Sequence, residues 1–331
     1  MAKLEDIEYD LAQARRIAEH RTARTERQLR KLYGELLRDL HQFMSQTYIQ
    51  YAQNDQLTYA MMQENGYYAR FLEEVEQRLN ILTPKASKVL QQLIEDTYTA
   101  AYHSMVDGVV KSYHDPKNHS LESTFGDSLA ITPEQIKAAV ENPVSGLTLS
   151  DTLEKNRKDI IYGIKKTIGV GLMNGDRYTT MARRIAAYVD GDYKKAIRIA
   201  RTETHRVRES GELDAALKVD AELQNGTTGM RMVKKWKTMK DERVRPQYVR
   251  KNRKGGWTRG VSKNGANHVK LEGQTVLVNE PFDLLDGNKA MAPSQSGVAA
   301  HDINCRCLAL KYLMDDDEYF EATGKHFPVS G

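Results

Sequence analysis

The chain has 331 residues, of which 40% are hydrophobic and 28% are charged, and its formal net charge is +4. This length suits two or three domains with enough residues to bury a core, and the high charge content favours long amphipathic helices over a compact enzyme. No apolar stretch approaches the roughly 20 residues that span a bilayer. The first residues, Met1 to Asp6, lead into acidic residues and not into the apolar core of a signal peptide. We therefore expect a protein of a cytoplasm-like compartment.

The first 112 residues are predicted to form an extended helical region that contacts other proteins. Apolar residues recur there at steps of four and three, which places them on one stripe of a helix. The residues of this stripe are Leu29, Tyr33, Leu36, Leu40 and Phe43. A further helix is predicted to begin near Pro84, with Thr83 as its N-cap, because proline is favoured in the first helical turn.

Residues 113–150 are predicted to form a loop and a linker helix. The polar run from His114 to Gly126 is typical of a surface loop. The sequence Thr132-Pro133-Glu134 predicts the start of a short helix, and Asn142-Pro143 predicts its end.

Residues 151–226 are predicted to be helical again. Ser150 or Asp151 is expected to cap the first of these helices. Two more helices are predicted over 179–188 and 193–223, joined by a turn at Asp190-Gly191-Asp192.

Glycines and short β-prone runs appear after residue 226, and they predict a small basic α+β domain over 227–312. An acidic tail follows at 313–331, with a helix expected from about Met314 to Glu321. The predicted fold is therefore mostly α in the N-terminal two-thirds, with long amphipathic helices, and α+β near the C-terminus.

The positive charge is concentrated in one segment. Between Arg231 and Lys270, here called the basic segment, there are 14 Lys or Arg residues and two acids, a local net charge of +12. Such a polycation repels itself unless a polyanion neutralises it, and aromatic rings among the cations can stack on unpaired bases. The alternative is a solvated loop whose aromatic residues belong to a core. The residues expected to contact DNA are Lys234, Lys235, Lys237, Lys240, Arg243, Arg245, Arg250, Lys251, Arg253, Lys254, Trp257 and Arg259.

Cys305 and Cys307 are the only two cysteines, and one residue separates them. A disulfide between them would close a small, strained ring, so free thiols or metal ligands remain. Thiolates and imidazoles are good zinc ligands, and alternate residues on a strand point to one side. His268, His301, Cys305 and Cys307 are therefore a candidate structural zinc site, and buried cysteines without a ligand are the alternative.

The common enzyme signatures do not occur in this sequence. It has no Gly-x-Gly-x-x-Gly or Walker A loop, no Gly-x-Ser-x-Gly elbow and no His-Glu-x-x-His helix. Asp241 and Glu242 beside Arg243 and Arg245 suit the acids and phosphate grip of a nuclease, but they also suit simple charge balance. The chain is therefore predicted not to be an enzyme, with a metal-dependent nuclease or transferase acting on nucleic acid as the alternative.

A set of short elements occurs in a fixed order between about residues 155 and 312. The elements are 175–185, 200–203, 235–238, 241–245, 268–273, 280–282 and 303–307, and the motif residues within them are Arg201, Thr202, Glu203, Trp236, Asp241, Arg245, His268, Gly273, Asn304, Cys305 and Cys307. In this order they resemble the phage Mu F-like minor head protein family, also called phage head morphogenesis proteins. One departure is the basic stretch from Pro246 to Asn267, which separates two elements that are close together in the family.

The resemblance implies a minor capsid component of a tailed phage, with 151–226 and 227–312 as the helical and basic parts of the Mu F-like domain. It implies portal, capsid or scaffolding proteins as partners, sequence-tolerant contact with double-stranded DNA, and ejection with the genome. The implied locations are the host cytoplasm during assembly and then the virion, at the capsid interior and portal vertex. No catalytic activity is implied for the common domain, although some relatives carry a fused toxin or transferase domain.

Overall fold

The structure is a computed structural model. It describes residues 4–64, 66–112, 129–142, 148–225, 229–241, 244–246, 248–250, 257–259 and 265–328. The predicted loop from His114 to Gly126 lies outside these residues. The chain divides into two compact units, which are described separately below. A helical unit comprises Thr22–Leu93 and Leu147–Ala200, and a sheet-containing unit comprises Met1–Arg21, Ile94–Gly146 and Arg201–Gly331.

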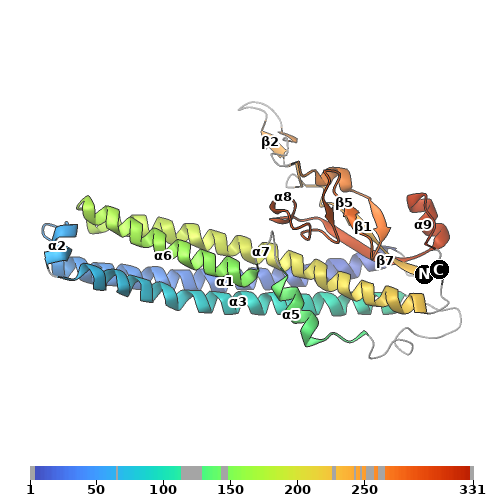
Figure 1. Ribbon diagram of the computed structural model, residues 1–331, viewed down its shortest axis with the longest axis horizontal. Coiled ribbons are helices and arrows are strands. Elements are labelled where there is room, and N and C mark those ends of the chain that lie inside the picture. Colours follow the sequence, from blue (N-terminus) through green and yellow to red (C-terminus); the bar gives the residue numbers. More distant parts are fainter. Residues whose placement is uncertain are drawn as a thin grey trace. The chain divides into compact units, whose positions relative to one another are not determined.

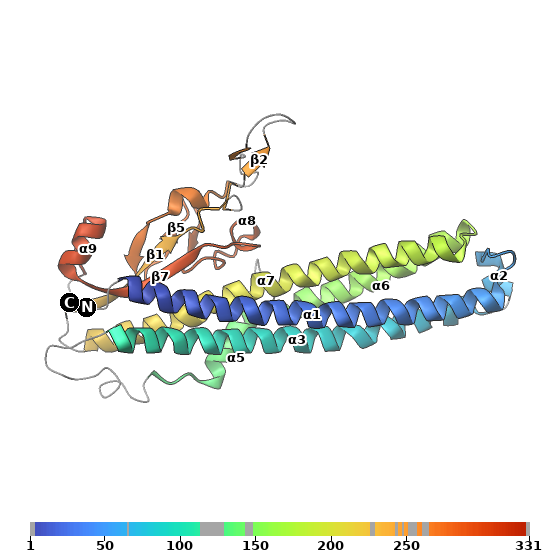
Figure 2. The same ribbon diagram turned by 180° about the vertical axis from the view of Figure 1, so that it is seen from behind.

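The helical unit contains segments of four long helices, which run side by side (Figures 1 and 2). They are α1 (Leu4–Tyr51), α3 (Tyr68–Ser112), α6 (Leu149–Met173) and α7 (Tyr178–Asn225), and the short α2 (Tyr59–Glu64) lies between α1 and α3 in the chain. The predicted stripe from Leu29 to Phe43 is buried in the core of this unit. Of the described helices, none is sufficiently long and apolar to cross a membrane.

The prediction that a helix begins near Pro84 is wrong, because Pro84 lies inside α3. The buried apolar positions of α3 recur at steps of four and three on both sides of the proline. They are Phe71, Val75, Leu79, Leu82, Ala86, Leu90 and Leu93. Burial of this uninterrupted stripe offsets the lost backbone hydrogen bond of a proline in a helix interior, which costs about 3 kcal/mol.

The predicted turn at Asp190-Gly191-Asp192 is also wrong, since α7 continues through it. Asp192 is buried, and its Oδ2 accepts a hydrogen bond of 2.6 Å from the hydroxyl of Tyr33 on α1. Val189 and Ala196 continue the buried stripe on either side. A tertiary contact thus holds as helix a sequence whose local signal favours a turn.

Three of the described helices begin at capping boxes, in which a side chain at each end of the first turn bonds to the other's backbone. Helix α5 (Pro133–Glu141) is capped by Thr132 and ends at Asn142, as predicted. Helix α6 is capped by Thr148 and not by Ser150 or Asp151; Asp151 is instead the third helical residue, which completes the box. The predicted acidic tail helix is confirmed as α9 (Asp316–Thr323), with Asp315 as its cap.

The sheet-containing unit is built on an antiparallel three-stranded sheet of order β4-β1-β7. Its strands are β1 (Met230–Lys237), β4 (Thr275–Leu277) and β7 (Leu308–Asp315). Two hairpins, a 3₁₀ helix and a short helix surround it. These are β2 (Tyr248–Arg250) with β3 (Trp257–Arg259), β5 (Phe282–Asp283) with β6 (Lys289–Ala290), η2 (His268–Leu271) and α8 (Ala299–Asp302). The predicted fold class is confirmed.

The two faces of this sheet have different neighbours. Val233, Leu277, Leu310 and Tyr312 pack with Tyr319 of α9 on one face. On the other, Met232 belongs to a core with α3 and the C-terminal part of α7. The central strand β1 is therefore covered on both faces, and every side chain on its second face must be apolar or find a partner.

Candidate functional site

The motif residues on α7 connect this helix to the other motif elements. Asn304 has a left-handed backbone with φ of 56°, and its amide donates to Oγ1 of Thr202 at 3.3 Å. Arg206 donates from Nε to Glu203 and from Nη2 to the carbonyl of Ala139 on α5, both at 2.9 Å. Burial raises the pKa of Glu203, with Arg206 opposing the shift. The Arg-Thr-Glu element thus holds neighbouring segments of the unit together.

One turn further along, α7 carries a buried ion cluster, which we define as Arg208, Glu209, Glu212 and Lys311. Nζ of Lys311, on β7, lies 3.0 Å from Oε2 of Glu209 and 2.7 Å from Oε2 of Glu212. Nη2 of Arg208 lies 2.8 Å from Oε1 of Glu209. Burial alone would raise the pKa of Glu209, but Lys311 and Arg208 outweigh it and lower the pKa to about 2. Burial raises the pKa of Glu212, with Lys311 opposing this shift and Glu209 adding to it. Lys311 and Arg208 therefore compensate two coupled carboxyl groups inside the unit.

The prediction that Lys234 contacts DNA is contradicted by its burial. The side chain has no exposed surface, and its Nζ donates to the carbonyl of Met291 at 2.7 Å. It lies over the ring of Phe282, 5.2 Å from the centroid. Because β1 is covered on both faces, alternation along the strand directs this lysine inward whatever the charge of its neighbours.

Burial and, to a smaller extent, the charge of Lys311 together lower the pKa of Lys234 to about 7. In the unfolded chain this lysine has an ordinary pKa of about 10.4. Between about pH 7 and 10.4, therefore, Lys234 is protonated in the unfolded chain and largely deprotonated in the folded protein. The free energy of unfolding is therefore expected to rise with pH over this interval. A Lys234→Met variant lacks this contribution, so its stability relative to wild type is expected to fall as pH rises from about 7 to 10. Denaturant unfolding of both proteins at pH values of about 7 and 10 measures this relative stability. If the difference in free energy of unfolding between variant and wild type is the same at both pH values, the lowered pKa of Lys234 is wrong.

The other predicted DNA contacts have different environments. Lys240 is exposed, 3.8 Å from Glu272, and Lys235 and Lys237 are half-buried. Arg245 donates to the carbonyls of His301 (2.6 Å) and Ile303, so its guanidinium stabilises the fold. Arg250, Trp257 and Arg259 lie on the β2–β3 hairpin, and Arg243, Lys251, Arg253 and Lys254 lie outside the described residues.

Three of the four candidate zinc ligands come together in the sheet-containing unit. His268 on η2, Cys305 and Cys307 are buried, and their ligand atoms all lie within 4.8 Å of one another. Nδ1 of His268 is 3.6 Å from Sγ of Cys305 and 3.4 Å from Sγ of Cys307. His301, on α8, stacks on His268 and contacts its Nε2 instead of the sulfurs. We call His268, Cys305 and Cys307 the thiol–imidazole cluster.

Other motif residues surround this cluster. Trp236 is buried and meets the rings of His268 and Phe282 edge to face, with centroids 5.5 and 5.2 Å apart. Gly273 has φ of 86°, and its amide donates to the carbonyl of Trp236 at 2.8 Å. Arg306 pairs with Asp241. Because Trp236 is buried, base stacking on this ring is not available.

Sequence reasoning missed two residues beside the cluster, Asp286 and His205. Oδ2 of Asp286 lies 2.7 Å from Nε2 of His301. Nδ1 of His205, on α7, lies 2.9 Å from Nη2 of Arg208. Neither residue is at ligand spacing from a cysteine in the sequence, so only folding places them there.

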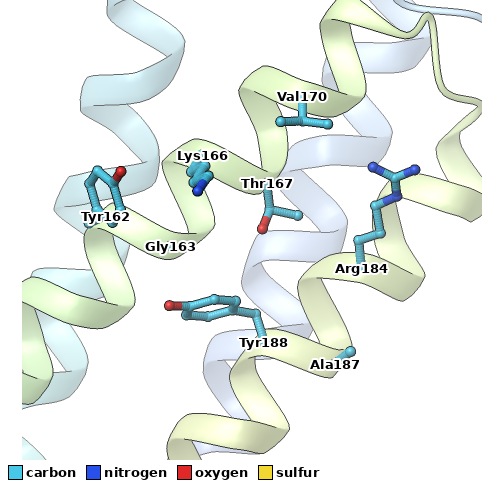
Figure 3. A pocket seen from close by; sticks show the side chains of 8 residues that line it. All are labelled: Tyr162, Gly163, Lys166, Thr167, Val170, Arg184, Ala187 and Tyr188. Carbon is cyan, nitrogen blue, oxygen red and sulfur yellow. The ribbon is translucent and has the colours of Figure 1, made fainter.

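The helical unit presents a separate surface groove of about 540 Å³ between α6 and α7 (Figure 3). The ring of Tyr188 lies across α6 at Gly163, where a Cβ would come 1.8 Å from its Cζ. Lys166 and Arg184 line the groove, beside the exposed ring of Tyr162.

Comparison with known proteins agrees with the motifs. Residues 162–255 match the family described as Phage Mu protein F like protein. This range contains the whole of α7, strand β1 and the motif residues from Arg201 to Arg245. The resemblance to the Mu F-like minor head proteins, predicted from the order of the short elements, is confirmed.

Two curated relatives extend the match over most of the chain. It is 27% identical to the minor head protein GP7 of Bacillus phage SPP1 over 295 residues, which are 88% of this chain and 83% of that protein. It is 26% identical over 289 residues to an NAD(+)--arginine ADP-ribosyltransferase, EFV, of Enterococcus faecalis. This second match covers 87% of the chain but 51% of that enzyme, so the chain spans about half of its length. No solved structure matches the chain.

Proposed function

We propose that this chain is a minor head protein of a tailed phage, located in the virion at the portal and capsid interior. We further propose that it contacts packaged DNA through its basic C-terminal domain and leaves the head with the genome. The observation that carries the head function is the similarity to GP7, which includes both the long helices and the sheet-containing unit. The phage-family match over residues 162–255 agrees with it.

Exposed apolar side chains support the helical unit as the part that binds portal, capsid or scaffolding proteins. Six large hydrophobic residues of this unit are exposed, and Ile49 and Met173 are 83% and 79% accessible. The other four are Tyr59, Ile81, Tyr162 and Val170. Apolar and aromatic side chains of this kind are typical of protein interfaces, where association removes them from water.

The charge of the basic segment supports the DNA contact. Three of its lysines, Lys235, Lys237 and Lys240, are at least partly exposed in the structure, and the β2–β3 hairpin carries Arg250 and Arg259. Lysines and arginines neutralise phosphates without reading bases. The contact is therefore proposed to be tolerant of sequence.

Binding of the purified chain to duplex DNA is expected to weaken steeply between low and moderate salt and to vary little with DNA sequence. Replacing Lys235, Lys237 and Lys240 together by glutamine is expected to reduce the slope of log K against log salt by about 0.9 for each phosphate contact removed. Lys234→Met is the matched control, because it removes one buried charge and should leave the slope unchanged. Salt-insensitive binding, or no binding at low salt, would contradict the proposal.

The purified chain can also be used to test two alternative functions. If the basic segment meets acidic protein surfaces instead of DNA, excess duplex will not compete in a pull-down with the portal protein. The similarity to an ADP-ribosyltransferase favours a transferase as the second candidate function, and a metal-dependent nuclease is a further enzymatic alternative. Incubation with labelled NAD⁺, and with DNA plus Mg²⁺ or Mn²⁺, is expected to yield neither label transfer nor cleavage. Asp241, one of the two candidate nuclease acids, pairs with Arg306, and Glu242 lies outside the described residues.

A further inference from the structure

The thiol–imidazole cluster has the composition and spacing of a metal site. Two sulfurs approach one imidazole nitrogen at 3.4 and 3.6 Å, and all three side chains are buried, with exposed fractions of 6% or less. The two cysteines are alternate residues leading into β7, so their side chains point to the same side. Both belong to one apolar cluster with Trp236 and Leu271. Both sulfurs therefore lie in an apolar environment, away from bulk solvent.

A chain of hydrogen bonds sets the proton positions on both histidines. For neutral imidazoles, the carboxylate of Asp286 accepts from Nε2 of His301 at 2.7 Å, which leaves Nδ1 of His301 as an acceptor. That nitrogen lies 3.1 Å from Nε2 of His268, which must then carry the proton. Nδ1 of His268 is thereby left as a lone pair facing the two sulfurs. A histidine ligand oriented through its second nitrogen by a carboxylate network is the usual arrangement around protein-bound metals.

Two N–H groups next to the sulfurs lack partners. Among the described residues, Nε1 of Trp236 and Nε2 of His205 are buried without a hydrogen bond. Arg208 only donates, so Nδ1 of His205 accepts from it and Nε2 carries the proton. This excludes Nε2 of His205 as a metal ligand while the Arg208 bond persists, and it makes His205, like Trp236, a donor.

The electrostatics of the cluster differ for its two thiols. The hydrogen bond from Cys307 lowers the pKa of Cys305, and His205 and His268 add to the shift. The same hydrogen bond, together with burial, raises the pKa of Cys307, although Trp236 and Arg245 act in the opposite direction. The two cysteines are therefore in unlike surroundings, although both sulfurs face Nδ1 of His268.

We propose that Cys305, Cys307 and Nδ1 of His268 bind one Zn²⁺ ion, with a solvent molecule as the fourth ligand. Two thiolates and an imidazole favour zinc in a tetrahedral site, and binding releases the thiol protons. His301 and Asp286 support the ligand His268, while Trp236 and His205 donate to the thiolates. A metal-free pair of thiols, each directed at His268, leaves both N–H donors unpaired. The ion would tie η2 to the segment that leads into β7.

The first test is metal analysis of the full-length chain purified under reducing conditions with zinc supplied. The expected result is one zinc per chain, released by a thiol-blocking mercurial, which can act only on Cys305 and Cys307 because the chain has no other cysteine. X-ray absorption of the bound zinc is expected to show two sulfurs at about 2.3 Å and lighter ligands at about 2.0–2.1 Å. Substoichiometric zinc, or a zinc shell without sulfur, would overturn the proposal.

Variants then separate ligand loss from misfolding. His268→Gln is expected to lose zinc, whereas His326→Gln, at an exposed histidine on the same unit, is expected to retain it. Asp286→Asn leaves all three ligands in place and is expected to weaken zinc binding about 10- to 100-fold in a chelator competition, with the two-sulfur shell unchanged. If affinity is unaffected by Asp286→Asn, the supporting role of Asp286 and His301 is wrong.

Discussion

Replacing Lys311 by methionine is expected to lower the free energy of unfolding by about 3–5 kcal/mol at neutral pH. The substitution preserves the apolar stem but leaves Glu209 and Glu212, both buried, with Arg208 as the remaining cation of the cluster. Nζ of Lys311 lies within 3.0 Å of a carboxylate oxygen of each. An uncompensated buried charge costs far more than the intact pair contributes, and this asymmetry makes the expected loss large. Urea unfolding monitored by circular dichroism measures it.

The pH dependence of this loss identifies its cause. In the wild type, the pKa of Glu209 is lowered to about 2, so the stability it contributes is present above the ordinary glutamate pKa and is lost as pH falls towards 2. In Lys311→Met the carboxylates lack their cation and take up protons more readily. The difference between variant and wild type is therefore expected to narrow as pH falls from 7 to 4.

Two further variants serve as controls for Lys311→Met. Lys325→Met, at an exposed lysine, is expected to change the free energy of unfolding by no more than about 0.5 kcal/mol. Adding Glu212→Gln to Lys311→Met removes one anion with the cation and is expected to recover much of the loss. A loss below about 1 kcal/mol for Lys311→Met alone would show that the cluster relaxes or admits water.

Gly211→Ala is expected to destabilise the protein by about 1–3 kcal/mol, although alanine is the better helix former by about 1 kcal/mol. An added Cβ on Gly211 would lie 2.6 Å from the carbonyl oxygen of Tyr98 and 3.1 Å from the amide nitrogen of Tyr102. Both are backbone atoms of α3, so the clash is relieved only by moving one helix against the other. That movement also loosens the bond of 2.6 Å from the Tyr98 hydroxyl to Asp214.

Gly191→Ala is the matched control in the same helix. Gly191 has no atom within 4 Å of an added Cβ, so the substitution is expected to stabilise α7 by about 0.5–1 kcal/mol. Thermal unfolding compares the two glycine-to-alanine variants: the melting temperature is expected to fall for Gly211→Ala and to rise for Gly191→Ala. Two stabilised variants would mean that α3 and α7 do not approach closely at Gly211.

The helix stripes were predictable because periodicity reports directly which face of a helix is buried. The apolar steps from Leu29 to Phe43 needed no knowledge of the partner helices. The errors at Pro84 and at Asp190-Gly191-Asp192 have one cause. Proline and glycine signals express local backbone preference, and the burial of long stripes on both sides outweighs a local preference of a few kcal/mol.

The candidate site was predictable in part for a different reason. Residue types restrict chemistry, so His268, His301 and the two cysteines were candidate metal ligands from the sequence, and the structure brings three of these four residues together. Lys234 was grouped with the other cations because net charge can be counted along a sequence. Whether a given lysine is buried cannot be counted in this way, since it depends on the fold. The roles of His205 and Asp286 depend on hydrogen bonds to Arg208 and His301, which no spacing in the sequence encodes.

By itself, the sequence determined the kinship, the helical stripes, the position of the basic segment and the small set of residues able to bind a soft metal. These follow from residue order and from local periodicity. The tertiary structure decided which cations face solvent, which histidine faces the sulfurs, and that Lys311 must neutralise two carboxylates on α7. These features depend on contacts between residues up to 102 positions apart in the sequence. Such contacts form only in the folded protein, where burial has removed water from the interacting groups.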